Sequence, residues 1–382
     1  MDTAQQTAAW AGYDDAFVLD MLATPTPFNV PGIYDAPLTA EMLANAKRSG
    51  ITAVNATLSH IGHQYSAFED AVRNFAYWER EFAAHPGVLM KIRSVADIED
   101  AKGTGRLGII AGFQDGTAFD DRADRVDMFY HLGLRVCQFT YNGRNLLADG
   151  CVEPAVADGP GNLVLCVPEA KAFTNLKAVQ ELHAGLSRLG RACIERMNAL
   201  GILVDLSHVG LKSSWDAIEA SKQPVAVTHS GARALADHAR NKPDDLLRAV
   251  ADRGGVVGAY MMVYLREEGQ PRLDDFMRHL EHLLRVCGED HVGIGTDLST
   301  TPLDLSDDFR RRWREGVLLR RRLGIGAKGE SEDVFAYIPE LNTPRRLDLV
   351  AAAMSRAGHS DARIAKVLGG NWMRLLGEVW RD

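Results

Sequence analysis

The sequence lacks the features that mark several large classes of protein. It has no apolar run of about 20 residues, the length that a membrane-spanning helix needs, and its longest stretch of that kind is GGVVGAYMMVY. Its first residues, MDTAQQTAAWAGYDD, hold no basic segment followed by an apolar one, so we expect no signal peptide. Lys and Arg number 43 against 51 Asp and Glu, a net charge of −8, so the basic excess typical of nucleic-acid binding is missing.

Cysteine is scarce, and common catalytic signatures are absent. The five cysteines form no CxxC pair, and an odd count at wide spacing indicates reduced thiols in a cytoplasmic protein. There is no GxSxG, no Cys/His nucleophile signature and no phosphate-binding loop. We therefore expect a small-molecule substrate, no organic cofactor, and no nucleic-acid or membrane partner. A homodimer is compatible with the sequence.

What the 382 residues do contain is an alternation of short apolar runs and longer amphipathic ones. Continuously apolar strands separated by helices, such as those expected at 40–49, 187–199 and 273–287, indicate a parallel sheet covered on both faces. Eight such units favour an α/β fold of the (β/α)8 TIM-barrel type, and the lack of a GxGxxG after any strand weakens the alternative, a doubly wound sheet. The expected strands are 16–22, 51–58, 107–113, 133–140, 201–206, 224–228, 255–262 and 291–296.

We expect one barrel domain over residues 1–382, with loop insertions at about 142–185 and 298–345. The first insertion is rich in Gly, Asp, Pro and Asn. The second carries a basic run, which is either a solvated helix face or a site for an anionic partner. The arginines of this run are Arg310, Arg311, Arg312 and Arg314, followed by Arg320, Arg321 and Arg322.

Polar side chains stand directly after three of the expected strands. His208 follows strand 5 in LVDLSH, His229 follows strand 6 in VAVTHS, and Asp297 follows strand 8 in GIGTD. In a barrel these positions meet at the carboxyl-end face, where catalytic groups lie. Two imidazoles and a carboxylate suit zinc or a similar divalent ion, with the carboxylate moving a proton. The alternative is a set of hydrogen-bonded rim residues without metal.

Two further groups are candidates for substrate contacts. Arg240, in DHARNKPDD, suits a substrate carboxylate, with Asn241 beside it, although an ion pair of Arg240 with a neighbouring aspartate at 244 or 245 is an equal alternative. His60 and His63, in SHIGHQY, are spaced so that one helical turn would point them the same way, which for most such pairs has no function. We include His60 among the candidate substrate contacts.

Several long segments resemble the membrane (renal) dipeptidase family of metallopeptidases, within the amidohydrolase-like barrels. They are GLSRLGRACIERMNALGILVDLSHVG, SKQPVAVTHSGARAL, ARNKPDDLLRAVADRGGVVG, HVGIGTD and IAKVLGGNWMRLLGEV. The resemblance is continuous from about 185 to 297, resumes from about 345, and is weaker but in register from 16 to 141. It implies a (β/α)8 barrel and an ancestry in zinc-dependent cleavage of dipeptides and related small amides.

The resemblance also implies roles for particular residues. The family holds two zinc ions, and its two histidines after strands 5 and 6 match His208 and His229. Its proton-shuttling aspartate after strand 8 matches Asp297, and its carboxylate-binding arginine matches Arg240.

The chain departs from the family at four positions. Leu22 and Thr24 stand in place of the His-x-Asp motif after strand 1, and Gln114 replaces the bridging glutamate after strand 3. Tyr141 stands in place of a substrate-polarising histidine after strand 4. The first zinc site therefore looks abolished, and a mechanism that needs a hydroxide shared by two ions should not operate unchanged.

We therefore predict one divalent ion, with zinc as the first candidate, on His208, His229 and Gln114. Asp297 and Tyr141 are the expected catalytic residues, Tyr141 as a donor to a developing oxyanion and a substrate contact. The predicted activity is metal-dependent hydrolysis of a dipeptide or a similar small amide carboxylate. Two alternatives stay open: a lyase, isomerase or decarboxylase acting on a small carboxylate metabolite, and a non-catalytic binding protein.

Overall fold

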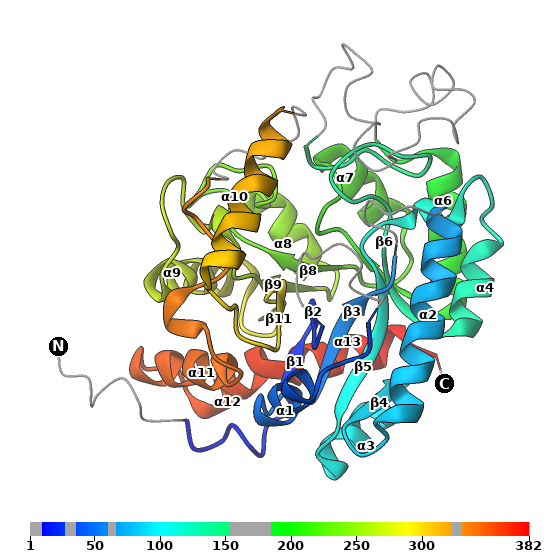
Figure 1. The fold of residues 1–382 in the computed structure, drawn as a ribbon. Helices are drawn as coiled ribbons and strands as arrows, with labels where there is room; N and C mark the ends of the chain where they lie inside the picture. The colour runs from blue at the N-terminus through cyan, green and yellow to red at the C-terminus, as the bar shows by residue number, and fades with distance from the viewer. Residues whose placement is uncertain (1–9, 27–35, 60–65, 153–184, 323–330, 382) are drawn as a thin grey trace.

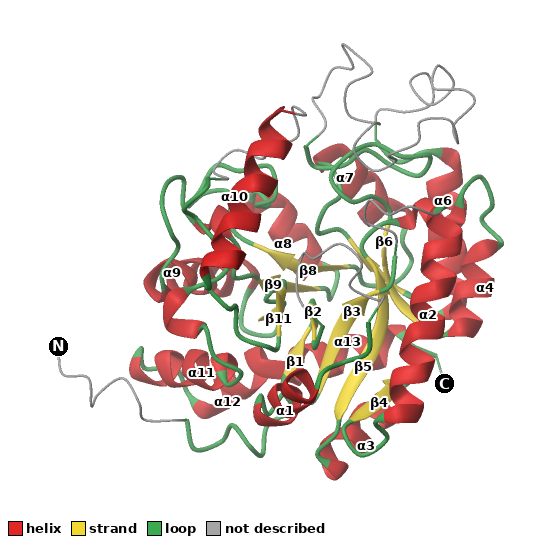
Figure 2. Ribbon diagram, viewed as in Figure 1, coloured by secondary structure: helices red, strands yellow, loops and turns green. Residues whose placement is uncertain are grey.

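A computed structural model of the protein describes residues 10–26, 36–59, 66–152, 185–322 and 331–381 (Figure 1). Strands occupy the centre and helices surround them, as the colouring by secondary structure shows (Figure 2). Within the described residues, no helix has the length and apolar character to span a membrane. The cysteines at 137, 151, 193 and 287 are free thiols, and the one at 166 lies outside the described residues.

The central sheet is parallel and follows the order β1-β3-β5-β6-β7-β8-β9-β10, with β4 added beside β5. Each of the eight strands predicted from the sequence is present. The strands of the described residues are β1 Leu19–Asp20, β2 Ala23–Thr24, β3 Ala53–Thr57, β4 Leu89–Ile92, β5 Leu107–Phe113, β6 Leu134–Gln138, β7 Leu203–Asp205, β8 Ala226–Ser230, β9 Val256–Ala259, β10 Val292–Ile294 and β11 Leu298–Ser299.

The sheet closes between its first and last strands. The N–H of Met21 donates to the carbonyl of Ile294 at 3.0 Å, and β2 pairs with β11 in a short parallel ladder. Strands 1 and 8 of the barrel are therefore each split in two, as β1 and β2 and as β10 and β11. The result is a nearly closed (β/α)8 barrel, as predicted.

Helices follow the strands around the barrel, and the three that the sequence predicted are α1, α6 and α9. Side-chain caps explain several starts, since Thr39, Ser66 and Ser187 each accept from a backbone N–H of the first turn. The α-helices are α1 Ala40–Arg48, α2 Ala67–Ala84, α3 Val95–Thr104, α4 Arg125–Leu132, α6 Arg188–Leu200, α7 Leu211–Ala220, α8 Asp244–Asp252, α9 Leu273–Cys287, α10 Asp307–Arg322, α11 Arg346–Arg356, α12 Asp361–Ala365 and α13 Asn371–Val379.

Shorter helical segments complete the described elements. They are the 3-10 helices η2 Gly116–Phe119, η5 Val263–Leu265 and η6 Pro339–Leu341, and the π-helix η7 Lys366–Gly370.

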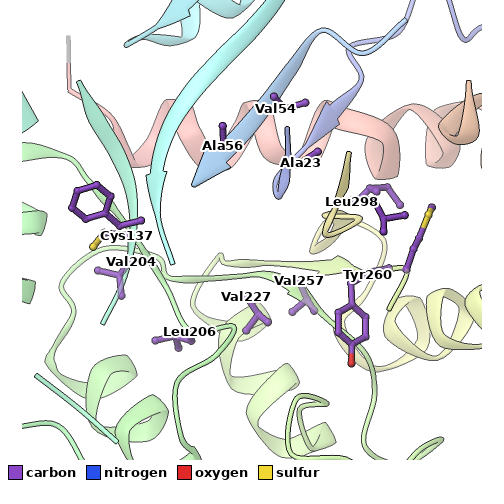
Figure 3. Close-up of a cluster of buried hydrophobic side chains, with 14 of the residues drawn as sticks. Ala23, Val54, Ala56, Cys137, Val204, Leu206, Val227, Val257, Tyr260 and Leu298 are labelled. Atoms are coloured by element: carbon purple, nitrogen blue, oxygen red, sulfur yellow. The ribbon is translucent and has the colours of Figure 1, made fainter. Parts of the chain in front are cut away.

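Alternate residues of the strands belong to two buried apolar clusters. The larger one includes Val204, Val227 and Val257 and extends to helices α8 and α9; Figure 3 shows several of its members, contributed by strands of both halves of the barrel. The smaller one takes the neighbouring residues of the same strands, with Leu203 and Ala226 among them, and extends to α13. This period of two is what a strand buried on both faces requires.

The C-terminal helix ties distant strands together. Trp372, at the start of α13, donates to the carbonyl of Ile294 at 3.1 Å, and Trp380, after its end, donates to the carbonyl of Arg135 at 3.3 Å. These two bonds connect β10 with β6, so α13 spans the barrel. The resemblance that resumed at about residue 345 therefore falls on a segment with a structural role in the barrel.

The basic run of the second predicted insertion lies on α10, which follows β11 and rises from the barrel (Figure 1). Arg311 and Arg312 both pair with Asp308, and Arg314 pairs with Glu332 at 3.6 Å. These arginines are exposed and balanced by acids of their own neighbourhood. The interpretation as a solvated helix face therefore fits the structure better than a site for an anionic partner.

Candidate active site at the carboxyl ends of the strands

His208 lies in the turn after β7, and contacts with other residues hold both its backbone and its ring. Its backbone N–H donates to Gln138 Oε1 at 2.8 Å, and its carbonyl accepts from the N–H of Cys151 at 2.8 Å. Its ring Nδ1 lies 2.7 Å from Oδ1 of Asn142, and the ring of Tyr141 stacks on it at 4.2 Å. An amide oxygen only accepts, so Nδ1 carries the proton and Nε2 carries the lone pair.

His229 ends strand β8, and its ring centroid lies 5.0 Å from that of His208. Its Nδ1 lies 2.9 Å from the hydroxyl of Thr228, and that hydroxyl donates to the carboxylate of Asp205 at 2.5 Å. Both histidines are buried. The Nε2 atoms of both are buried as well, and neither has a hydrogen-bond partner within the described residues.

The electrostatics keep both rings neutral. Burial lowers the pKa of His208 and of His229 well below the ordinary value, and the positive charges of Arg240 and Lys242 lower both further. A neutral imidazole with a proton on Nδ1 presents a free lone pair on Nε2, which is the form that binds a metal ion. The pair is therefore prepared either to ligate a cation or to accept a proton.

Arg240 and Lys242 reach this turn from the loop after β8. Arg240 Nη1 donates to the carbonyl of Ser207 at 2.5 Å, and Lys242 Nζ donates to the carbonyl of Val209 at 2.6 Å. These carbonyls flank His208 on both sides. Arg240 is buried, yet its Nη2 has no partner among the described residues, so one arm of the guanidinium is available to an anionic ligand.

Lys242 is 1% exposed, and burial lowers the pKa of its ammonium to about 7. The sequence did not point to this residue, because a lysine beside Asn241 in a polar loop is most often solvated. It belongs to the loop that carries Arg240, and it supports the turn at His208.

Asp297 stands where β10 gives way to β11 and has an unusual backbone. Its φ of 62° lies in the left-handed region that favours glycine, and its N–H donates to the carbonyl of Leu22 at 2.8 Å. Burial raises the pKa of its carboxyl group to about 7, with Asp20 adding to the rise and Arg240 opposing it. A carboxyl group with a pKa near neutrality suits proton transfer at physiological pH.

Asn241, in the loop that follows β8, is hydrogen-bonded within the protein. Its Nδ2 donates to the carbonyls of Ala236 and Tyr264, both at 2.8 Å, and its Oδ1 accepts from the hydroxyl of Tyr260 at 2.6 Å. Both N–H bonds of the fully buried amide are thus used inside the protein. Asn241 therefore holds the loop that carries Arg240, and its predicted contact with substrate stays a prediction.

On the opposite side of the face, neither Leu22 nor Thr24 supplies an imidazole or a carboxylate. Leu22 is buried, and the hydroxyl of Thr24 shares a hydrogen bond of 2.7 Å with Thr26. Gln114 is buried after β5, with its backbone N–H held by the hydroxyls of Thr57 and Ser59. The role of Gln114 as a third ligand stays a prediction.

Asp115, the neighbour of Gln114, uses its carboxylate in hydrogen bonds with other residues of the protein. Its carboxylate accepts from the N–H and the hydroxyl of Thr117 and from the amide of Asn145. It therefore caps η2. His60 and His63 lie outside the described residues.

Within the described residues, the donor set offers part of the coordination shell of one divalent ion. His208 and His229 supply two free imidazole nitrogens, and histidine is a common zinc ligand. Among the described residues, no group of three or more His, Cys, Asp or Glu side chains is placed to hold a metal ion. Leu22 has no ligand atom, and the Thr24 hydroxyl is hydrogen-bonded to Thr26, so these two side chains do not match the His-x-Asp ligands expected there.

Comparisons with known proteins decide the family. The model of the membrane dipeptidase family, peptidase family M19, matches residues 40–162 and 167–323. The chain belongs to this family. It is 30% identical to the crystal structure of an amidohydrolase from Pseudomonas aeruginosa, with a TM-score of 0.76 over 97% of this chain and 98% of that one.

Two other known proteins are similar to this chain over most of its length. The dipeptidase aclJ of Aspergillus oryzae is 27% identical over 323 residues, which are 83% of this chain and 63% of that protein. A metallo peptidase from Rhodobacter sphaeroides, solved with a phosphinate mimic of the dipeptide L-Ala-D-Ala, shares the fold with a TM-score of 0.71 at 19% identity, over 96% of this chain and 99% of that one. The M19 chain described here is thus a hydrolase of the dipeptidase family with a (β/α)8 barrel.

Proposed function

We propose that this M19 hydrolase cleaves a dipeptide or a similar small amide that carries a free carboxylate, with one divalent metal ion, zinc, at His208 and His229. The observation that carries the proposal is a set of three buried nitrogens without partners in the described structure. They are Nε2 of His208, Nε2 of His229 and Nη2 of Arg240. Buried polar atoms are normally paired, so three such atoms around one turn indicate a ligand.

The residues present divide the work as follows. A zinc ion held by His208 and His229 would supply two things, a lowered pKa for a water molecule and polarisation of the scissile carbonyl group. Arg240 binds the substrate carboxylate through Nη2 while Ser207 holds Nη1 in place. Asp297, with its pKa near 7, takes a proton from the attacking water and delivers it to the nitrogen of the leaving amine.

Tyr141 is the expected donor to the oxyanion that forms as water adds to the carbonyl. Its ring is partly exposed and lies parallel to that of His208, with an interplanar angle of 22°. The stack holds the tyrosine ring against His208, and we propose that its hydroxyl contacts the carbonyl oxygen of a bound substrate. The same proposal places the enzyme in the cytoplasm, which the free thiols of the four described cysteines support.

The test compares matched substrates. Purified protein with zinc is given a panel of dipeptides, N-acyl amino acids and, for each, the form in which the free carboxylate is converted to an amide. We expect cleavage of acids, little cleavage of their amidated forms, and no activity after chelation or in His208→Ala. Equal cleavage of both forms, or activity that survives chelation, would contradict the proposal.

A further inference from the structure

A buried carboxylate reaches the ring of His229 through a hydroxyl group. Thr228 Oγ1 lies 2.5 Å from Asp205 Oδ2 and 2.9 Å from His229 Nδ1. Asp205 ends strand β7, Thr228 lies on the neighbouring strand β8, and Asp205 and Thr228 are both at most 1% exposed. Water therefore does not compete for these bonds.

The other contacts of Asp205 decide which way the protons point. Its Oδ1 accepts from the N–H groups of Ser207 and Thr228, at 3.0 and 2.9 Å, and from the hydroxyl of Ser207 at 2.6 Å. The carboxylate of Asp205 thus accepts four hydrogen bonds and acts only as an acceptor. The single proton of the Thr228 hydroxyl is then donated to Oδ2 of Asp205. The oxygen of Thr228 can then only accept from Nδ1 of His229.

We propose that Asp205, acting through Thr228, is a positioning residue that holds His229 in the tautomer with the proton on Nδ1. Nε2 is thereby kept as a lone-pair donor directed at the site. The consequence for metal binding rests on the proposed function, whereas the tautomer does not. Burial raises the pKa of Asp205, and the same four donors oppose that rise.

A second pair in the molecule has the same geometry without a ring attached. Thr296 donates to Asp20 through its N–H at 2.7 Å and its hydroxyl at 2.6 Å, and Leu22 N–H donates to the same carboxylate at 3.3 Å. Thr228 precedes His229 and Thr296 precedes Asp297. Thr296 therefore provides a matched control for the loss of a threonine hydroxyl beside a buried aspartate.

The experiment compares Thr228→Val, Thr228→Ser and Thr296→Val with the wild type. Nitrogen NMR of the histidine rings in metal-free protein reports the tautomer, and competition with a chromophoric chelator reports the zinc affinity. We expect the wild type and Thr228→Ser to show His229 protonated on Nδ1. We expect Thr228→Val to lose that preference and to bind zinc about 10- to 100-fold more weakly. Thr296→Val should keep the wild-type affinity while losing a similar amount of thermal stability.

Two results would overturn the inference. One is a wild-type His229 protonated on Nε2, which would mean that Asp205 holds a proton and that the chain of bonds runs the other way. The other is an equal change of zinc affinity in Thr228→Val and Thr296→Val. A wild type that binds no zinc contradicts the proposed function instead, and the tautomer measurement still decides the inference.

Discussion

Two sides of the carboxyl-end face share the same hydrogen-bonded aspartate–threonine pair but differ in the side chains that stand beside it. Asp205, at the end of β7, accepts hydrogen bonds from Thr228 on the neighbouring strand β8. Asp20, at the end of β1, accepts hydrogen bonds in the same way from Thr296, which follows β10 across the closure of the barrel. Each threonine precedes a site residue. On the first side the unit supports His229, with His208 beside it, whereas on the second it lies below Asp297, with the apolar Leu22 opposite.

This comparison indicates that the aspartate–threonine pair serves the fold and that the histidines beside one pair serve the proposed metal site. The aspartate–threonine unit joins neighbouring strands where their carboxyl ends meet, and it also occurs on the side where Leu22 and Thr24 stand in place of the expected ligands. The buried Asp20 accepts hydrogen bonds from the N–H and the hydroxyl of Thr296, so its polar atoms are paired within the protein. The side of β7 and β8 therefore carries the predicted metal site, and the side of β1 and β10 carries Asp297, the residue proposed to transfer protons.

The largest loss of activity should come from removing one of the two histidines that are proposed to bind the metal. His229→Ala should lower kcat/KM by at least about a thousandfold, since several kcal/mol of transition-state stabilisation are lost with the ion. Leu22→Met, a volume-conserving change on the other side, should leave activity close to wild type. Steady-state kinetics on the best amide substrate measures both, and a similar loss in the two variants would remove the contrast.

Arg240→Met should raise KM by about 10- to 100-fold, because a charged hydrogen bond to the substrate carboxylate contributes about 1.5–3 kcal/mol. Arg253→Met is the control, since Arg253 likewise donates to a backbone carbonyl, that of Ile218 at 2.6 Å, in a contact outside the site. A fall of kcat with KM unchanged would assign Arg240 to the chemical step instead of to binding.

The contrast can also be reversed by design. The triple variant L22H/T24D/Q114E restores the ligand types that the family uses after strands 1 and 3. We expect it to bind a second divalent ion per chain, measured by elemental mass spectrometry. Circular dichroism checks that the triple variant is folded. If the folded variant still binds one ion, then these three side chains are not the whole reason why the side of β1 and β10 lacks a metal site.

The smallest effect concerns Asp297 in metal-free protein. Burial raises its pKa to about 7 from the ordinary 3.8, so between these values the folded protein holds a proton that the unfolded chain has released. Its contribution to stability therefore falls as pH rises through this window. Relative to wild type, Asp297→Asn should gain stability between pH 4.5 and 7.5 in urea unfolding. No relative change would mean that Asp297 is ionised throughout.

Much of the barrel is readable from the sequence, because its strands are buried on both faces and appear as continuous apolar runs. The strand β4 was missed, since LMKI is only four residues long and pairs with β5 alone, outside the closed order. The division of strands 1 and 8 was also missed. The side chain of Asp20 bonds the backbone N–H groups of Leu22 and Thr296, which interrupts the regular strand at that point.

The site was readable only where side chains stand at strand ends. His208, His229 and Asp297 fall in those positions, and the structure places the two histidine rings together. Asp205 and Thr228 lie inside apolar strands, where the one signal was a charged residue in LVDL that had to find partners. Asn142 and Lys242 come from loops, and their contacts with the His208 turn depend on loop conformation that no periodicity encodes.

Metal content tests the central claim most directly. Wild type and His208→Ala are incubated with zinc, freed of excess metal by gel filtration and measured by elemental mass spectrometry. One zinc ion per chain in the wild type and none in the variant is the expected result. Two ions in the wild type would show that other side chains replace Leu22, Thr24 and Gln114. No ion at all would contradict the metal site and favour either metal-free chemistry or a binding role.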